Sequence, residues 1–214
     1  MLTIHAADAV LATSPRCDAV AVDGGLIVGV GMLDRMTAEW PLARVRRWPG
    51  LMTPGLVNHQ AAALLEAAYH PDPREADELG TEPITGDALA ALAMDDARWG
   101  ASARRGLQRM LQHGTTAVAG PFHRPTVRTA VARSGLRVRE PRQGREVEAA
   151  LALDVFAALP LSAVLGGDLA AGRPADLAVF DVPVDELPAR ALRLHGAGTC
   201  VATVLGGRLL HRRR

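Results

Sequence analysis

The chain has 214 residues, 24 basic against 23 acidic side chains, a formal net charge of +1 and 49% hydrophobic residues. This composition is typical of soluble globular proteins and excludes the collagen-like and intrinsically disordered classes. All 24 basic residues are arginine, which excludes lysine-dependent chemistry such as a Schiff base or a carbamylated-lysine metal ligand.

The first third of the sequence predicts short β-strands. Apolar and polar residues alternate through residues 2–31, interrupted by an Asp-Gly-Gly turn at 23–25, a pattern that favours a β-hairpin or meander. Another strand is predicted at Arg44–Trp48. A compact apolar run follows around 51–57, after a proline-glycine turn.

The middle of the chain alternates strands and helices. Residues 70–86 are rich in proline, glycine and acid and predict an irregular loop or lid. Helical spacing follows over 87–113, then a short buried strand at 115–120, a helix at 125–135 and a strand at 136–140. Such alternation is typical of parallel β/α units, so we predict an α/β fold.

The last part of the chain predicts one more helix at 145–159 and then β-structure. Strands are expected in DLAVFDVP and TCVATVLGGRLLHRR, the second folded at a Gly206-Gly207 turn. Because both chain ends predict strands, the simplest way to bury their apolar faces is one sheet domain from which the α/β segment projects.

Five segments, in order along the chain, resemble one family. They are DGGLIVGVG (23–31), TPGLVN (53–58), HGTTAV (113–118), LGGDLAAGRPADLAVFD (165–181) and VATVLGGRLL (201–210). Together they resemble the metal-dependent amidohydrolase superfamily, of the imidazolonepropionase, cytosine deaminase and aminofutalosine deaminase type. The resemblance implies a small β-sandwich composite domain from residues 1–50 and 161–214, beside a shortened, partial β/α barrel at 51–160.

The metal-binding positions depart from that family. Its first barrel strand continues as Asn-x-His-x-His, whereas this chain has Asn58, His59, Gln60, Ala61 and Ala62, so imidazole is lost at Gln60 and Ala62. His59 is one residue out of register, which on a strand would point it to the opposite face. The family's later histidines and aspartate would fall where only PRQG (141–144) stands. The resemblance therefore implies a truncated, degenerate member without a metal cofactor, acting as a non-catalytic binding or assembly protein.

An alternative is a hydrolase acting on carbon–nitrogen bonds of a small cyclic nitrogen compound, with a rebuilt or metal-free site. Asn58, His59, Gln60 and His123 follow the first two barrel strands, where parallel α/β folds place their sites, and form a candidate pocket. In the simpler interpretation, His123 is a loop histidine that is hydrogen-bonded to the backbone and lines no pocket. A rebuilt metal site would use His59, His70 and His123.

Several other polar residues have simpler interpretations. His70 with Asp72, Glu75 and Asp77 is expected in a solvated loop, with a divalent-ion site as the alternative. Asp176 is expected to shape a turn, not to catalyse.

The incomplete barrel predicts a partner, because uncovered strand edges must be paired or shielded. We expect a homodimer or a protein partner covering the open barrel edge, with a small-molecule ligand as a further option. Near-neutral charge argues against nucleic-acid binding, and no apolar run is long enough to span a membrane. Cys17 and Cys200 are expected to be free thiols in a cytoplasmic protein.

Overall fold

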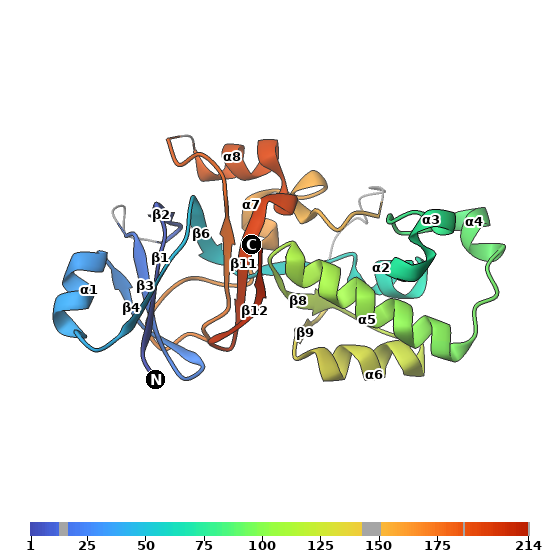
Figure 1. The fold of residues 1–214 in the computed structure, drawn as a ribbon, viewed down its shortest axis with the longest axis horizontal. Helices are drawn as coiled ribbons and strands as arrows, with labels where there is room; N and C mark the ends of the chain where they lie inside the picture. The colour runs from blue at the N-terminus through green and yellow to red at the C-terminus, as the bar shows by residue number, and fades with distance from the viewer. Residues whose placement is uncertain (13–16, 143–150, 186, 214) are drawn as a thin grey trace. The chain divides into compact units, whose positions relative to one another are not determined.

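The computed structural model describes residues 1–12, 17–142, 151–185 and 187–213 (Figure 1). It contains three β-sheets and several helices, so the predicted α/β class is confirmed. The chain divides into two compact units. Unit 1 comprises Met1–Val57, Leu111–Thr116 and Asp154–Arg214, and unit 2 comprises Asn58–Met110 and Ala117–Leu153.

The three sheets have four, five and three strands. The first has the order β4 (Leu26–Gly31), β3 (Ala19–Asp23), β1 (Thr3–Ala6), β5 (Arg44–Arg47). The second has the order β12 (Arg208–Arg212), β11 (Cys200–Leu205), β10 (Leu177–Phe180), β6 (Leu51–Pro54), β2 (Ala9–Val10). The third has the order β7 (Leu56–Asn58), β8 (Thr115–Ala119), β9 (Arg137–Arg139).

Both predicted glycine-turn hairpins are present in unit 1. β3 and β4 pair antiparallel across the Asp23–Gly25 turn, and β11 pairs with β12 across Gly206 and Gly207. These last two residues have φ values of 54° and 75°, which only glycine adopts readily. The Asp176 carboxylate accepts a hydrogen bond from the Gly206 N–H at 2.8 Å, which confirms that Asp176 shapes this turn.

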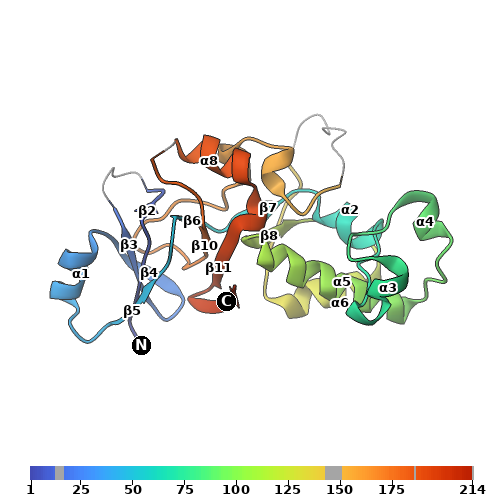
Figure 2. The same ribbon diagram turned by 45° about the horizontal axis from the view of Figure 1, so that its top comes forward.

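Strands from the two chain ends share one apolar core in unit 1. In Figure 2 the blue strand β2 and the orange-red strands β10 and β11 lie in the sheet that β6 joins. The buried cluster combines Val20, Val22 and Ile27 with Leu177 and Val204. Successive residues of β3, β10 and β11 are buried, so these strands bury both of their faces.

The helices are mostly short. The α-helices are α1 (Leu33–Glu39), α2 (Ala61–Glu66), α3 (Ala76–Leu79), α4 (Gly86–Ala90), α5 (Asp96–Gln112), α6 (Pro125–Ser134), α7 (Leu161–Val164) and α8 (Pro188–His195). The 3-10 helices are η1 (Pro73–Glu75), η2 (Val155–Ala157) and η3 (Ala197–Thr199). Among the described residues, none of these helices has the length and apolarity needed to cross a bilayer.

Three predicted segments differ from the structure. Residues 87–113 are not one helix, because Asp95 accepts a hydrogen bond from the Arg98 N–H at 2.7 Å and so caps a new helix, α5. Residues 70–86 are not irregular throughout, since η1 and α3 form over residues 73–79, behind a capping box of Asp72 and Glu75. Of the helix predicted at 145–159, residues 145–150 lie outside the described residues, and only η2 forms in the remainder.

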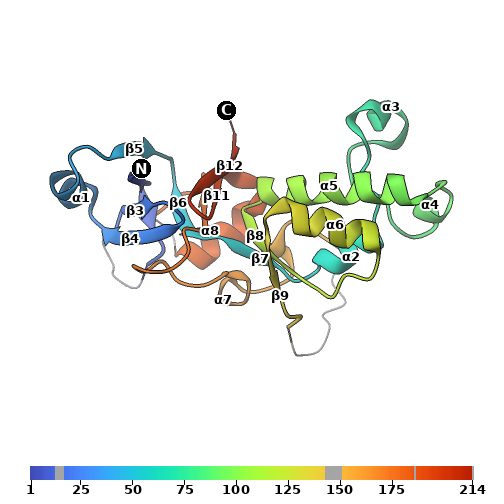
Figure 3. The ribbon, with the colours of Figure 1, turned by 90° about the horizontal axis from the view of Figure 1, so that it is seen from below.

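The predicted strand–helix–strand unit is confirmed for β8, α6 and β9. β8 and β9 are parallel, with Val118 opposite Val138. Between them α6 begins at Pro125 and ends at Gly135, which has a left-handed φ of 77°. α5 and α6 run side by side in Figures 1 and 3.

Candidate functional site

Asn58, His59 and Gln60 lie at the end of β7, in a turn that leads into α2. The Asn58 side-chain oxygen accepts a hydrogen bond from the Gln60 N–H at 2.9 Å, which closes the turn. Gln60 is the residue that precedes the first turn of α2, and Ala62 lies within that helix. The strand argument that placed His59 on an opposite sheet face is therefore wrong, because the strand ends before His59.

The two positions that the resemblance assigns to metal ligands have other roles here. The Gln60 side-chain oxygen accepts a hydrogen bond from the Ala152 N–H at 3.2 Å, and so ties two distant segments of unit 2 together. Ala62 offers only a methyl group. These residues do not fit the metal that the family resemblance implies, because a carboxamide engaged with backbone and a methyl group replace two imidazoles.

Asn58 is the most buried member of the candidate pocket, with an exposed fraction of 1%. Its Nδ2 atom is buried, and among the described residues no acceptor lies within hydrogen-bond reach of it. A buried amide donor without an acceptor is costly and uncommon in native proteins. The Asn58 side chain is therefore satisfied only through its oxygen, in the turn to Gln60.

His123 is held by its backbone, and its side chain is exposed. The backbone N–H groups of His123 and Arg124 both donate to one carboxylate oxygen of Glu66, each at 2.6 Å. The His123 carbonyl accepts from the Arg128 guanidinium at 2.5 Å. Its imidazole is thus not locked toward the Asn58–Gln60 turn, and that four-residue pocket stays a prediction.

Glu66 is a positioning residue that the sequence argument missed. It ends α2 and anchors the loop after β8 through the two N–H groups described above. Its position in the sequence could have indicated this role, because a carboxylate at a helix C-terminus is disfavoured by the helix dipole and needs hydrogen-bond donors from elsewhere.

The expected solvated loop at His70 is wrong for that residue, which is fully buried. Its ring Nε2 atom lies 2.9 Å from the Leu64 carbonyl oxygen. The backbone N–H of His70 donates to the Ser102 hydroxyl at 2.9 Å. Its Nδ1 atom is buried, with no partner among the described residues. Burial, with smaller contributions from Arg109 and Arg105, outweighs the Leu64 contact and lowers the pKa of the imidazole to about 4.

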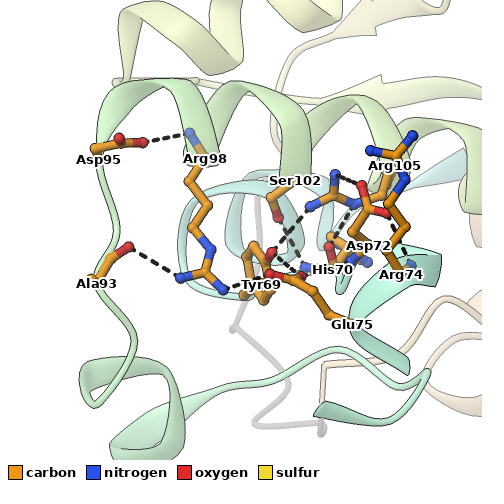
Figure 4. Close-up of polar contacts among 10 residues, drawn as sticks. All are labelled: Tyr69, His70, Asp72, Arg74, Glu75, Ala93, Asp95, Arg98, Ser102 and Arg105. Atoms are coloured by element: carbon orange, nitrogen blue, oxygen red, sulfur yellow. Dashed lines mark hydrogen bonds and ion pairs between the residues drawn. The ribbon is translucent and has the colours of Figure 1, made fainter. Parts of the chain in front are cut away.

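A network of arginine, tyrosine and carboxylate groups packs residues 69–75 against α5 (Figure 4). Arg98 and Arg105 lie over the Tyr69 ring, with guanidinium carbons 4.7 and 5.6 Å from its centre. The Tyr69 hydroxyl donates to Glu75 at 2.5 Å, and Arg98 donates to the other oxygen of Glu75 at 2.9 Å. Arg105 pairs with Asp72 at 3.2 Å and donates to the His70 carbonyl at 2.8 Å.

These contacts shift two ionisations. Hydrogen bonds from Tyr69 and from the Asp72 N–H lower the pKa of Glu75. Burial, and then the bond to Glu75, raises the pKa of Tyr69. Asp72 and Glu75 thus serve as ion-pair and capping groups, and we interpret the cluster as a structural clamp.

The described residues do not bring together the other metal-ligand groups that the sequence suggested. In the ranges the structure describes, no three His, Cys, Asp or Glu side chains come together in a way that could hold a metal ion. His59, His70 and His123 are accordingly not brought together there. Cys17 and Cys200 are free, as expected, and burial raises the pKa of the Cys200 thiol.

Comparison with known proteins gives distant structural similarity only. No protein-family model matches the chain, and no curated protein sequence matches it. Aspergillus niger ochratoxinase is similar with 20% identity and a TM-score of 0.42, over 65% of this chain and 31% of that one. Escherichia coli guanine deaminase is similar with 15% identity and a TM-score of 0.44, over 64% and 35%.

Helicobacter pylori aminofutalosine deaminase is similar with 15% identity and a TM-score of 0.37, over 64% of this chain and 32% of that one. The chain thus spans about a third of the length of these structures. Similarities with TM-scores this low carry no argument about the chemistry of this chain, so the site is judged on its own residues.

Proposed function

We propose that this chain is an amidohydrolase-like protein that lacks the metal-ligand set of that superfamily and acts by binding or assembling with another protein. In this proposal the terminal strands form the composite β-sandwich domain, and the middle of the chain forms a partial barrel. The main support for this proposal is Gln60, which lies where the family that the chain resembles has a metal ligand. Its side-chain oxygen is used to hold the Ala152 backbone.

The open sheet edge supports an assembly role. Among the described residues, β9 is the last strand of the three-stranded sheet, and Val138 at its centre has an exposed fraction of 59%. An exposed apolar side chain on an edge strand is a common feature of surfaces that pair with another chain. A homodimer or a protein partner that covers this edge is accordingly part of the proposal.

A second candidate function rests on Asn58. Its buried Nδ2 donor, at the carboxyl end of β7, could bind a carbonyl or ring nitrogen of a small ligand. In this alternative the protein is a hydrolase acting on carbon–nitrogen bonds of a small cyclic nitrogen compound without a metal.

Metal analysis combined with an ammonia-release assay separates these functions. Protein purified without chelators would be analysed for zinc, iron and manganese and incubated with a panel of cyclic amides and amino-substituted rings. The assembly proposal expects neither stoichiometric metal nor ammonia release. About one metal per chain, lost in His59→Ala, would overturn it in favour of a rebuilt hydrolase site. Metal-independent ammonia release that Asn58→Ala abolishes would establish the second candidate.

A further inference from the structure

Two arginines and a tryptophan lie on one face of the first sheet, at the β5 edge. β5 pairs in parallel with β1, and the register places Arg46 opposite His5. Because side chains alternate along a strand, Arg44 and Arg46 lie on the same face of the sheet as His5. Trp48 follows β5 on this face, since its indole N–H donates to the His5 Nδ1 atom at 3.2 Å. Arg44, Arg46 and Trp48 thus form one row of side chains.

A third arginine reaches this row from the second sheet. β12 ends that sheet in the described part of the chain, and Arg212 pairs with Ala202, a member of the apolar core. The Arg212 guanidinium carbon lies 5.7 Å from the centre of the Trp48 ring. A guanidinium group packed on an aromatic face keeps its N–H donors available for other partners. Arg212 therefore meets Arg46 and Trp48 where the edges of the two sheets come together.

The three guanidinium groups have no counter-ion within the described ranges. No Asp or Glu described by the structure forms an ion pair with Arg44, Arg46 or Arg212. Burial, and then the charges of Arg44 and Arg212, lower the pKa of Arg46. Like charges held together in a partly buried place repel one another, and a bound anion would relieve this repulsion.

We infer that Arg44, Arg46 and Arg212 bind the phosphate or diphosphate group of a small phosphorylated molecule. A guanidinium group donates two parallel hydrogen bonds to phosphate oxygens, and three such groups match an anion with two or more negative charges. Trp48 orients Arg212 and leaves hydrogen bonding to the arginines, because its own N–H is bonded to His5. The site lies within unit 1 and is independent of the proposed assembly function.

The small size of the cluster favours a single phosphate or diphosphate group over a long polyanion. Arg44 and Arg46 are two residues apart, which places their α-carbons about 6.5 Å from each other along the strand. Nucleic-acid surfaces instead spread many basic residues along a stripe and belong to strongly basic domains, whereas this chain has a net charge of +1.

The test is a calorimetric titration of inorganic diphosphate into the full chain at low ionic strength. We expect one saturable site per chain, with binding that weakens as salt is added. Arg46→Gln is expected to weaken binding roughly tenfold, and Arg46→Lys, which keeps the charge but not the planar fork, is expected to weaken it less. No saturable binding of millimolar diphosphate to the parent protein would overturn the inference.

The matched control is Arg47→Gln. Arg47 is on the same strand and exposed, but its side chain lies on the opposite face, and the substitution makes the same change in net charge. Binding of diphosphate to this variant is expected to equal that of the parent. An equal loss in Arg46→Gln and Arg47→Gln would mean that diphosphate senses only net charge, which would contradict a site on one face.

Two further measurements separate binding from a structural role. The NMR signal of the Trp48 indole N–H, assigned by its absence in Trp48→Phe, is expected to shift as diphosphate is added, because Arg212 packs on that ring. Diphosphate is expected to raise the unfolding temperature of the parent but not of Arg46→Gln. A variant that unfolds at a lower temperature but binds diphosphate like the parent would make Arg46 a structural residue and overturn the inference.

Competing anions identify the source of the phosphate group. Citrate, a carboxylate anion of similar charge, is expected to bind more weakly than diphosphate, and equal binding would overturn the assignment to phosphate. Displacement of diphosphate by oligothymidylate at a lower total phosphate concentration would show a nucleic-acid surface instead. Cosedimentation with vesicles that contain phosphatidic acid would show a membrane surface. Either of these last two results would overturn the assignment to a small molecule.

Discussion

The imidazole of His70 fills the space beside Gly106 on α5. A β-carbon on Gly106 would lie 2.6 Å from the His70 Nε2 atom and 2.8 Å from a methyl carbon of Leu65. Neither neighbour can move freely, because both side chains are fully buried and Nε2 is bonded to the Leu64 carbonyl. The close approach of α5 to the His70 segment therefore depends on a glycine at this position.

Gly106→Ala is expected to destabilise the protein by about 1–3 kcal/mol, the usual cost of forcing an extra methyl group into a packed core. The measurement is the free energy of unfolding from urea denaturation. Gly100→Ala on the same helix is the control. Its β-carbon would lie 3.5 Å from the nearest atom outside the helix, so better helix propensity is expected to leave stability unchanged or raise it by up to about 1 kcal/mol. Equal losses in the two variants would contradict the packing argument.

Acid is expected to destabilise the fold through two buried histidines. Burial lowers the pKa of both His70 and His5 to about 4, and the Trp48 indole N–H donates to the His5 Nδ1 atom at 3.2 Å. Between a pKa of about 6.5 in the unfolded chain and about 4 in the folded one, the unfolded chain binds more protons. The contribution of each neutral histidine to the free energy of unfolding is therefore fully present above about pH 6.5. It falls with acidification, by up to about 1.4 kcal/mol per pH unit for each histidine.

His70→Gln isolates one of these contributions. A glutamine amide can still donate to the Leu64 carbonyl, but it does not titrate. We expect the variant to be less stable than the parent near pH 7 and the difference to shrink as the pH falls toward about 4.5. Urea unfolding across this range measures it, and parallel pH profiles for the two proteins would refute the assignment to His70.

Tyr69→Phe removes the hydroxyl that links Glu75 and Arg105. We expect a loss of about 1–2 kcal/mol of stability, since two charge-assisted hydrogen bonds disappear while the ring remains under both guanidinium groups. Amide hydrogen exchange should accelerate in α3. Arg74→Gln is the control on the same segment, because Arg74 contacts Asp72 through its backbone N–H, which the substitution keeps. Unchanged exchange in Tyr69→Phe would mean that the clamp does not hold α3.

Local patterns predicted the elements whose causes are local. The hairpins at Gly24-Gly25 and Gly206-Gly207 follow from alternating strands around residues that tolerate positive φ. The β8–α6–β9 unit follows from Pro125 and Gly135, which mark the helix ends in the sequence. These features required no knowledge of distant contacts.

The parts that could not be predicted depend on distant contacts. Residues 70–79 have the composition of a loop, and their order comes from Arg98 and Arg105, which follow much later in the chain. The burial of His70 similarly depends on Gly106. At the candidate site, the absence of imidazole at Gln60 follows directly from the residue type. The end of β7 at Asn58 and the bond from Gln60 to Ala152 do not follow from local sequence.

The turn between β11 and β12 offers the sharpest test of a role predicted from sequence. The Gly206 N–H is bonded to the Asp176 carboxylate, and the Gly207 N–H is bonded to the Ala175 carbonyl at 2.9 Å. Asp176→Ala is expected to cost about 1–2 kcal/mol, because a turn amide loses its acceptor. Asp176→Asn keeps an acceptor oxygen in place and is expected to cost less than half as much.

Thermal unfolding of both Asp176 variants, with amide exchange at Gly206, checks this prediction. Faster exchange at Gly206 in the alanine variant, with near-parental exchange in the asparagine variant, would establish that the acceptor matters for the turn. Equal losses in the two variants would instead assign the stabilisation to the negative charge, because alanine and asparagine both remove that charge but only alanine removes the acceptor. The turn geometry would then not be the reason for an aspartate at this position.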